Sequence, residues 1–335
     1  MRRSHITILI TGAGTATTLS VIKGIKQQKE FVVRVIACDR NDNVSGHYIA
    51  DKFYKIPSAE DPAFLSTLLR IIKKERVNMI IPIVDYEFKK FAGHKAQFEK
   101  LGATVVLSDL PAIETCTDKF KTMKFFDSLK LPHPESYTFH RAKHARAGYP
   151  LFLKPSVFGR ATIDAYTLTN KKDLLFYAGK VKQPIIQEFI DGTEITIDAL
   201  NDFRGKFVFG VARVRTETKS GLSIKGVVIR DDKLMGFVKR ITEALPIIGP
   251  CNIQCFKTKN GYVFSEVNPR FAGAQTLSIQ AGFNSILLLC KLYSDKSVDP
   301  ATISIQYGTK MIRYWEEIFL TSEGKPYQAD YSLIK

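Results

Sequence analysis

The N-terminal third of the chain alternates short apolar runs with amphipathic segments. Residues 6–13 form an apolar run ending at Gly12-Ala13-Gly14, and a helical pattern to about Gln28 leads to a second run, residues 32–37. Short, continuous apolar runs separated by helical periodicity are typical of buried parallel strands joined by helices. The sequence therefore predicts an α/β domain built on a doubly wound parallel sheet.

The alternation continues along the next seventy residues. It predicts helices over residues 64–74 and 87–101 and strands over 79–84 and 104–107, so that the first domain covers residues 1–110. The glycine turn is an incomplete dinucleotide fingerprint, because Thr17 stands where a third glycine is expected. The pattern thus gives little support to NAD binding.

Two acidic residues, Asp85 and Glu87, follow the predicted strand at residues 80–84. Sheets of this class place ligands beyond the carboxyl ends of their strands, which favours a substrate-binding role. Acidic residues also stabilise the first turn of a helix, and the sequence leaves both interpretations open.

The polar positions of residues 249–273 carry the most specific pattern. Two strands meet at an Asn260-Gly261 turn; Gln254 lies on the first, and Glu266, Asn268 and Arg270 alternate along the end of the second. Alternating residues share one face of a strand. Oxygen ligands suit Mg²⁺ held against nucleotide phosphates, and arginine offsets phosphate charge. A solvated polar face is the alternative, but Pro269 and the small-residue loop after it indicate a site at a strand end.

The remaining patterns predict an α+β region. Strands are expected to Ile190, from Glu194, and over residues 208–215 and 223–229, with a flexible connection at 217–221. Helices are expected over residues 118–129, 232–244 and 275–292, and Tyr314-Trp315 is expected to pack against the body. Arg213 and Arg215 share a strand face, where they either grip a substrate carboxylate or remain surface charges.

Gln254 and Glu266-Val267-Asn268-Pro269-Arg270 together resemble the metal-binding strands of the ATP-grasp superfamily, in the branch of the carbamoyl-phosphate synthase large subunit. The order Lys154, Glu188, Glu194, Gln254, Glu266, Asn268 also resembles that family. The resemblance implies that Gln254, Glu266 and Asn268 bind Mg²⁺ (or Mn²⁺). It also implies that Arg270 and Lys119, with Asn268, act on the transferring phosphate of ATP.

The resemblance further implies a nucleotide site. Lys154 would reach the α-phosphate and adenine edge, the hinge Gln187-Glu188-Phe189-Ile190 would hold adenine, and Glu194 would bind the ribose hydroxyls. Relatives usually have several glycines in the loop that closes over the phosphates, whereas residues 156–160 contain only Gly159. Arg160 would supply the lost phosphate contact.

The fold implied is a Rossmann-like pre-ATP-grasp domain (1–110) followed by an ATP-grasp fold of two α+β subdomains, a small or linker subdomain (111–183) and a C-terminal subdomain with the metal site and a short tail (184–335). The implied activity is an ATP-dependent carboxylate–amine or carboxylate–thiol ligase that uses an acyl phosphate. A carbamoyl-phosphate or bicarbonate-activating synthase is one alternative, disfavoured by the single ATP-grasp unit and the lack of a glutaminase signature. A non-catalytic ATP-binding regulator is another, suggested by the glycine-poor loop.

Composition narrows the partners. The chain of 335 residues carries a formal net charge of +16, which favours anionic ligands such as nucleotide phosphates and an acidic substrate. Its basic residues are scattered and no nucleic-acid-binding motif is present, so a nucleic-acid partner is not expected. The five cysteines fit buried, reduced thiols. The absence of an 18-residue apolar run predicts a cytoplasmic protein without membrane contact, and a homodimer is expected from the resemblance.

Overall fold

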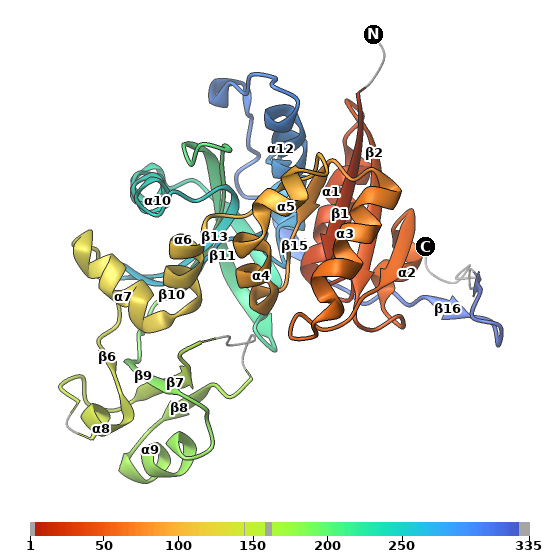
Figure 1. The fold of residues 1–335 in the computed structure, drawn as a ribbon. Coiled ribbons are helices and arrows are strands. Elements are labelled where there is room, and N and C mark those ends of the chain that lie inside the picture. Colours follow the sequence, from red (N-terminus) through yellow and green to blue (C-terminus); the bar gives the residue numbers. More distant parts are fainter. Residues whose placement is uncertain (1–3, 144, 158–162, 328–335) are drawn as a thin grey trace, which may run out of the picture.

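The computed structural model describes residues 4–143, 145–157 and 163–327. Three sheets and a short hairpin carry the strands of these residues (Figure 1). One sheet is parallel and belongs to the N-terminal part of the chain, and the other two are antiparallel. The mixed α/β and α+β architecture expected from the sequence is confirmed.

The N-terminal sheet has the strand order β3-β2-β1-β4-β5, and every adjacent pair is parallel. Its strands are β1 His5–Thr11, β2 Val32–Asp39, β3 Lys52–Lys55, β4 Met79–Ile81 and β5 Thr104–Val105. Because β1 lies at the centre, both of its faces are covered: Ile8, Leu9 and Ile10 are fully buried. The predicted parallel sheet is therefore present, although β4 is shorter than the pattern indicated.

Helices cover both faces of this sheet. They are α1 Ala16–Gln27, α2 Ser45–Ile49, α3 Ala63–Glu75, the 3₁₀ turn η1 Asp85–Glu87, α4 Phe88–Gly93 and α5 Lys95–Glu99. The prediction of one helix over residues 87–101 was wrong. The helix divides at Gly93 and His94, where glycine lowers helix propensity and the His94 backbone leaves the helical region.

The large antiparallel sheet has the order β14-β13-β10-β11-β12-β15. Its strands are β10 Thr193–Asn201, β11 Phe207–Lys219, β12 Leu222–Ile229, β13 Gly249–Thr258, β14 Gly261–Asn268 and β15 Lys310–Ile312. The flexible connection predicted at residues 217–221 was wrong. Strand β11 extends to Lys219, and Ser220 and Gly221, both at positive φ, make a two-residue hairpin turn whose twist matches the strands.

Two layers of helices enclose the large sheet. Helices α6 Leu110–Thr117, α7 Lys119–Ser128 and α10 Asp232–Ala244 contribute to a core on one face, whereas α11 Thr276–Gln280 and α12 Ser285–Tyr293 contribute to a core shared with the N-terminal sheet. The single helix predicted over residues 275–292 was wrong. Gly282 divides it at a φ of +114°, and a side chain there would collide with the Ser304 carbonyl.

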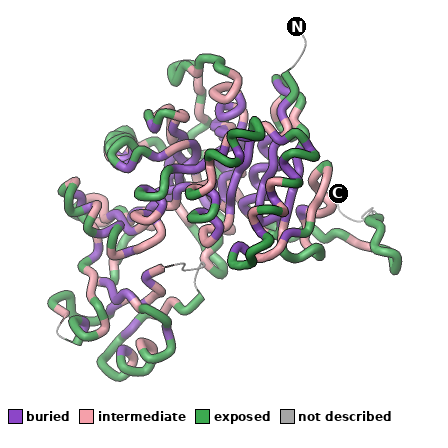
Figure 2. Tube along the Cα trace, in the orientation of Figure 1, coloured by how far each residue is buried: buried purple, intermediate pink, exposed green. Residues whose placement is uncertain are grey.

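A four-stranded sheet of order β6-β9-β7-β8 forms a separate lobe at the lower left of Figure 1. It contains β6 Ser136–Tyr137, β7 Leu151–Pro155, β8 Tyr166–Leu168 and β9 Pro184–Glu188, with helices α8 Phe139–Ala142 and α9 Lys171–Ala178. Its core is small, so exposed and half-buried positions dominate the lobe in Figure 2. Strand β9 belongs to this sheet, so the chain crosses to the large sheet at residues 189–192. The domain boundaries 1–110, 111–183 and 184–335 remain a prediction.

The last part of the chain contains a 3₁₀ turn, η2 Pro300–Thr302, and the hairpin β16 Phe319–Leu320 and β17 Pro326–Tyr327. After β15 adds to the edge of the large sheet, the chain leaves the body (Figure 1). The prediction that Tyr314 and Trp315 pack against the body was wrong, because they are 77% and 76% exposed.

All five cysteines are free and buried, as expected. Within the described ranges, the helices lack the length and apolar character that crossing a membrane requires.

Candidate functional site

A row of polar side chains crosses four strands of the large sheet. In the strand register, Arg213 of β11 lies opposite Thr196 of β10, which lies opposite Gln254 of β13, and Gln254 lies opposite Glu266 of β14. Directly opposed residues of antiparallel strands point to the same face. The face shared by these four residues forms one wall of a cavity.

This cavity has a volume of about 440 Å³ and lies between the small and large antiparallel sheets. It gathers residues from distant parts of the chain, from Thr17 to Ala274. The sequence-predicted residues that line it are Lys119, Lys154, Gln187, Glu188, Phe189, Ile190, Glu194, Arg213, Arg215, Gln254, Glu266, Asn268 and Arg270. The predicted phosphate-contact residues Gly159 and Arg160 lie outside the described residues.

The strand ends as the pattern indicated. Strand β14 stops at Asn268, directly before Pro269, and Arg270 follows in a bend. Because proline cannot donate to a sheet ladder, the chain leaves the sheet here, and Arg270 becomes part of the cavity lining.

Glu266 is surrounded by positive charge. The Nζ atom of Lys119 lies 3.7 Å from Glu266 Oε1. Burial opposes the ionised carboxylate, but the charges of Lys119, Lys154 and Arg270 outweigh it and hold the pKa of Glu266 below its usual value. This part of the cavity therefore places one ionised carboxylate among three cations, a local surplus of positive charge for phosphate groups.

The start of α7 explains how Lys119 reaches this position. Asp118 caps the helix, and its carboxylate accepts hydrogen bonds from the backbone N–H groups of Phe120 and Lys121. The Lys119 N–H donates to the Ser156 carbonyl at the end of β7, which fixes the helix start beside the small sheet. A lysine in the first turn opposes the helix dipole, but this lysine is buried and its ammonium group faces Glu266.

Lys154, on β7, has a pKa lowered to about 8. Burial is the main cause and the charge of Lys119 adds to it, whereas Glu266 and Glu194 oppose it. In the free protein the ammonium form is therefore present below pH 8 and is lost above it.

We expect ATP affinity to fall as the pH rises through 8, because bound phosphates favour the ammonium form of Lys154 and binding then takes up a proton. The expected loss is about tenfold between pH 7 and pH 9. Calorimetric titration of ATP across this range measures it. In Lys154→Arg, whose guanidinium stays charged, the alkaline loss should disappear; an equal loss in that variant would contradict the assignment.

The predicted adenine hinge leaves β9 at the cavity edge. Gln187 is 2% exposed, and its side-chain amide donates a hydrogen bond to Ser136 Oγ of β6. This hydrogen bond holds the first residue of the hinge against the neighbouring strand. Glu188 is half-buried, and its N–H donates to the Glu135 carbonyl at 2.8 Å. The Glu194 carboxylate accepts a hydrogen bond from Arg215, which also donates to the Gly221 carbonyl. Arg215 thus ties the tip of the β11–β12 hairpin to the residue predicted to bind ribose.

Arg213 is not a surface charge, since it is 2% exposed. Its Nε and Nη2 atoms donate to both carboxylate oxygens of Asp198, at 2.9 and 3.2 Å. Asp198 also accepts from Ser278 and Asn252. Sequence reasoning missed Asp198, Asn252 and Thr196, although Glu194, Thr196 and Asp198 alternate along β10 in the same way as the metal-strand residues do along β14.

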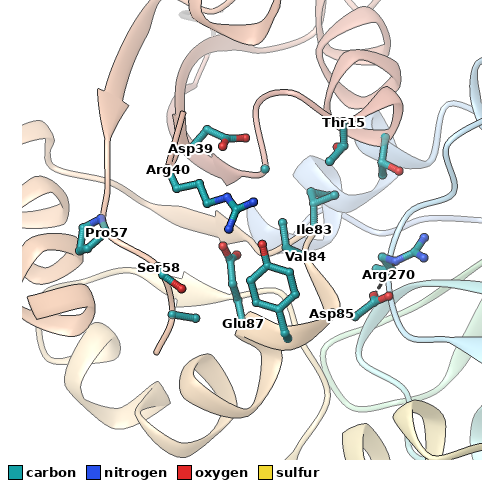
Figure 3. Close-up of a pocket in the computed structure, with 14 residues that line it drawn as sticks. Thr15, Asp39, Arg40, Pro57, Ser58, Ile83, Val84, Asp85, Glu87 and Arg270 are labelled. Carbon is teal, nitrogen blue, oxygen red and sulfur yellow. Dashed lines mark hydrogen bonds and ion pairs between the residues drawn. The ribbon is translucent and has the colours of Figure 1, made fainter. Parts of the chain in front are cut away.

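Asp85 and Glu87 line a second cavity of about 300 Å³, at the carboxyl end of the N-terminal sheet (Figure 3). Asp85 accepts a hydrogen bond from Arg270 Nε at 2.8 Å. Arg270 and Thr17 line both cavities, so the two spaces adjoin at these side chains. Asp39 and Arg40 were not predicted as site residues, although the apolar run of β2 ends at them.

The oxygen donors fit a magnesium ion better than a transition metal. Gln254 and Asn268 offer amide oxygens and Glu266 a carboxylate, and Asn268 donates to Glu266. Mg²⁺ is usually bound by one or two carboxylates together with substrate phosphates. Among the described residues no group of three or more His, Cys, Asp or Glu could hold a metal by itself, so a bound ion here would depend on phosphate oxygens.

Comparisons with known proteins agree with this architecture. Residues 8–106 match the family model for the PylC-like N-terminal domain, and residues 180–314 match the model for ATP-grasp in the biosynthetic pathway with Ter operon. The carbamoyl phosphate synthase large chain of Clostridium acetobutylicum is 26% identical over 288 residues, which cover 77% of this chain and 26% of that protein. The corresponding protein of Caldanaerobacter subterraneus is 26% identical over 285 residues, covering 77% and 25%. The chain therefore spans about a quarter of the length of these relatives.

Solved structures show the same fold. N5-carboxyaminoimidazole synthetase from Staphylococcus aureus, complexed with ADP, superposes with a TM-score of 0.73 at 16% identity, covering 91% of this chain and 81% of that one. The biotin carboxylase domain of Hydrogenobacter thermophilus 2-oxoglutarate carboxylase gives 0.69 at 14% identity, covering 91% and 73%. The chain thus contains an ATP-grasp domain and a PylC-like N-terminal domain, and carbamoyl phosphate synthase large chains are among its relatives.

Proposed function

We propose that the protein is an ADP-forming ligase that uses ATP and Mg²⁺ to activate a carboxylate as an acyl phosphate and then joins it to an amine. The observation that carries this proposal is the single cavity in which Glu266, Gln254 and Asn268 face Lys119, Lys154 and Arg270. Phosphoryl transfer depends on positioning and charge stabilisation rather than on a protein nucleophile, and this set supplies both.

Each group has a proposed task. Residues 187–190 and Glu194 hold the nucleoside, and Lys154 holds the phosphates. Glu266, Gln254 and Asn268 would hold Mg²⁺, which when bound supplies charge neutralisation for the phosphate oxygens. Lys119 and Arg270 offset the charge that develops on the transferring phosphoryl group, at the point where the two cavities adjoin.

The test is ADP release from ATP and Mg²⁺ in the presence of pooled carboxylates, with and without pooled amines and thiols. A ligase releases ADP only when its carboxylate is present, and hydroxylamine traps the acyl phosphate as a hydroxamate. A non-catalytic regulator binds ATP but gives no ADP with any pool. That result would overturn the proposal.

Bicarbonate activation is the second candidate. The H. thermophilus biotin carboxylase structure contains MgADP and bicarbonate, and the sequence relatives are carbamoyl phosphate synthases. Bicarbonate is therefore tested alone in the same assay. ADP release that depends on bicarbonate and on no other carboxylate would favour this candidate.

A thiol that accepts the acyl group in place of an amine would be recognised by release of a thioester.

A further inference from the structure

The second cavity contains a buried carboxylate whose charge is only partly compensated. Glu87, at the end of η1, is 6% exposed, and its Oε2 atom has no hydrogen-bond partner among the described residues. Its other contact is the Thr11 hydroxyl. A buried charged group without a partner is costly, so its presence beside a cavity indicates that a ligand completes it.

The charges around Glu87 favour a cation rather than an anion. The pKa of Glu87 is raised to about 7, mainly by burial; the Thr11 hydroxyl opposes the rise, and the charges of Asp39 and Asp85 contribute to it. Asp85 is neutralised by Arg270, whereas the Asp39 carboxylate accepts backbone N–H groups of Gly14 and Asn41. A ligand that carries a positive charge would offset the carboxylates that remain.

One cation of the cavity lies at its rim. Arg40 is exposed and makes no ion pair with any described residue. Figure 3 shows its side chain extending from the end of β2 towards the Glu87 carboxylate. The cavity thus presents an acidic group inside and a guanidinium at its edge, which matches a small molecule with an ammonium and a carboxylate group.

We propose that this second cavity binds the amine substrate, a small α-amino acid held as a zwitterion with its ammonium group at Glu87 and its carboxylate at Arg40. This inference rests on the proposed ligase function. The position is suited to the second half-reaction, because Arg270 lines both cavities and the amino acid therefore lies next to the phosphoryl-transfer site.

In the reaction, the ammonium group first gives one proton to Glu87. The neutral amine nitrogen then attacks the carbonyl carbon of the acyl phosphate, the C–N bond forms, and the bond from that carbon to the phosphate oxygen breaks. The nitrogen loses its second proton to the departing phosphate, which leaves as HPO₄²⁻.

The other ionisable residues that line the cavity are Asp39, Asp85, Arg40, Arg270 and Tyr86.

The test is calorimetric binding of each of the common amino acids, with a non-hydrolysable ATP analogue and Mg²⁺ present. We expect one small amino acid to bind, and its deaminated and decarboxylated analogues to bind at least tenfold more weakly. Glu87→Gln should lower the affinity for the amino acid by about 30-fold without changing the affinity for the ATP analogue. Arg40→Met should lower the affinity for the amino acid but not the affinity for the decarboxylated amine. Glu60→Gln, an exposed change in the same domain, is the matched control and should bind as the wild type does.

Two results would overturn the inference. One is ADP release that requires a carboxylate but responds to no amino acid, which would leave the ligase function standing. The other is equal binding of the deaminated analogue, unaffected by Glu87→Gln. Conversely, amino-acid binding that depends on Glu87 and Arg40, in a protein that never releases ADP, would support the cavity assignment while contradicting the ligase function. Retained ATP-analogue binding verifies that each variant is folded.

Discussion

Glu266→Ala should reduce ADP release by about 10²–10³-fold, the usual size of the loss when one transition-state contact is removed from a preorganised site. Glu266 is the single carboxylate among the three predicted metal ligands, and its charge is maintained by Lys119, Lys154 and Arg270. Without it, the site keeps only the amide oxygens of Gln254 and Asn268. Those oxygens are neutral and do not hold a divalent ion by charge.

The same substitution should not weaken the binding of ATP in the absence of metal. Removing Glu266 leaves the cations of the cavity with less compensating charge, so the polyanionic nucleotide should bind as tightly as before or more tightly. A direct role in metal binding therefore predicts a separation: turnover is lost and its Mg²⁺ requirement rises, whereas metal-free ATP affinity is maintained. General unfolding would lower both.

The measurements are ADP release over a Mg²⁺ titration and ATP binding in chelator. Glu266→Gln retains an oxygen ligand without the charge and should lie between the wild type and Glu266→Ala. Glu99→Ala, on the exposed side of α5, is the matched control. Turnover in Glu266→Ala at the wild-type rate, with an unchanged Mg²⁺ requirement, would show that the metal assignment is wrong.

Sequence reasoning predicted which side chains share a face where the pattern is local. Glu266, Asn268 and Arg270 alternate within five residues. Gln254 joins them only because the register shifts between Gln254 and Cys255, which places Gln254 opposite Glu266 and is not given by the Asn260-Gly261 turn. Local periodicity fixes which side chains share a face. It also indicated the parallel sheet, because each apolar run is long enough to be a buried strand.

Sequence reasoning failed where a tertiary contact decides the conformation. The amphipathic pattern of residues 275–292 is continuous, yet the chain turns at Gly282 because residue 304 lies against it. Tyr314 and Trp315 are apolar enough to suggest burial, but the strand before them pairs at a sheet edge and directs the chain outwards. Neither outcome is visible in a window of ten residues.

The same limit explains the ambiguous arginines. From sequence, Arg213 and Arg215 are an equivalent pair on one strand face. In the structure Arg213 donates hydrogen bonds to Asp198, whereas Arg215 donates to Glu194 and to the β11–β12 hairpin. The partners lie 15 and 21 residues away, on a neighbouring strand whose register the arginines themselves do not reveal.

We expect Asp198→Ala to lower the free energy of unfolding by about 3–5 kcal/mol, the usual cost of removing one partner from a buried ion pair. Asp198 and Arg213 are each 2% exposed, and the aspartate accepts two hydrogen bonds from the guanidinium. It also accepts from Ser278 of α11, at 2.6 Å, and from Asn252 of β13. The substitution would leave a buried guanidinium without its charge partner in the wall of the cavity that contains Glu266.

A double variant distinguishes the lost pair from lost packing. Asp198→Leu combined with Arg213→Met replaces both charges with apolar side chains and should recover much of the stability. Asp109→Ala removes the exposed partner of Lys95 and should cost no more than about 1 kcal/mol. Urea unfolding should be followed by circular dichroism, because the single tryptophan, Trp315, is 76% exposed and would report poorly on the core. If Asp198→Ala were no more destabilising than Asp109→Ala, the buried network would not be holding strands β10, β11 and β13 to α11, and the geometry of the polar row would have to depend on the sheet alone.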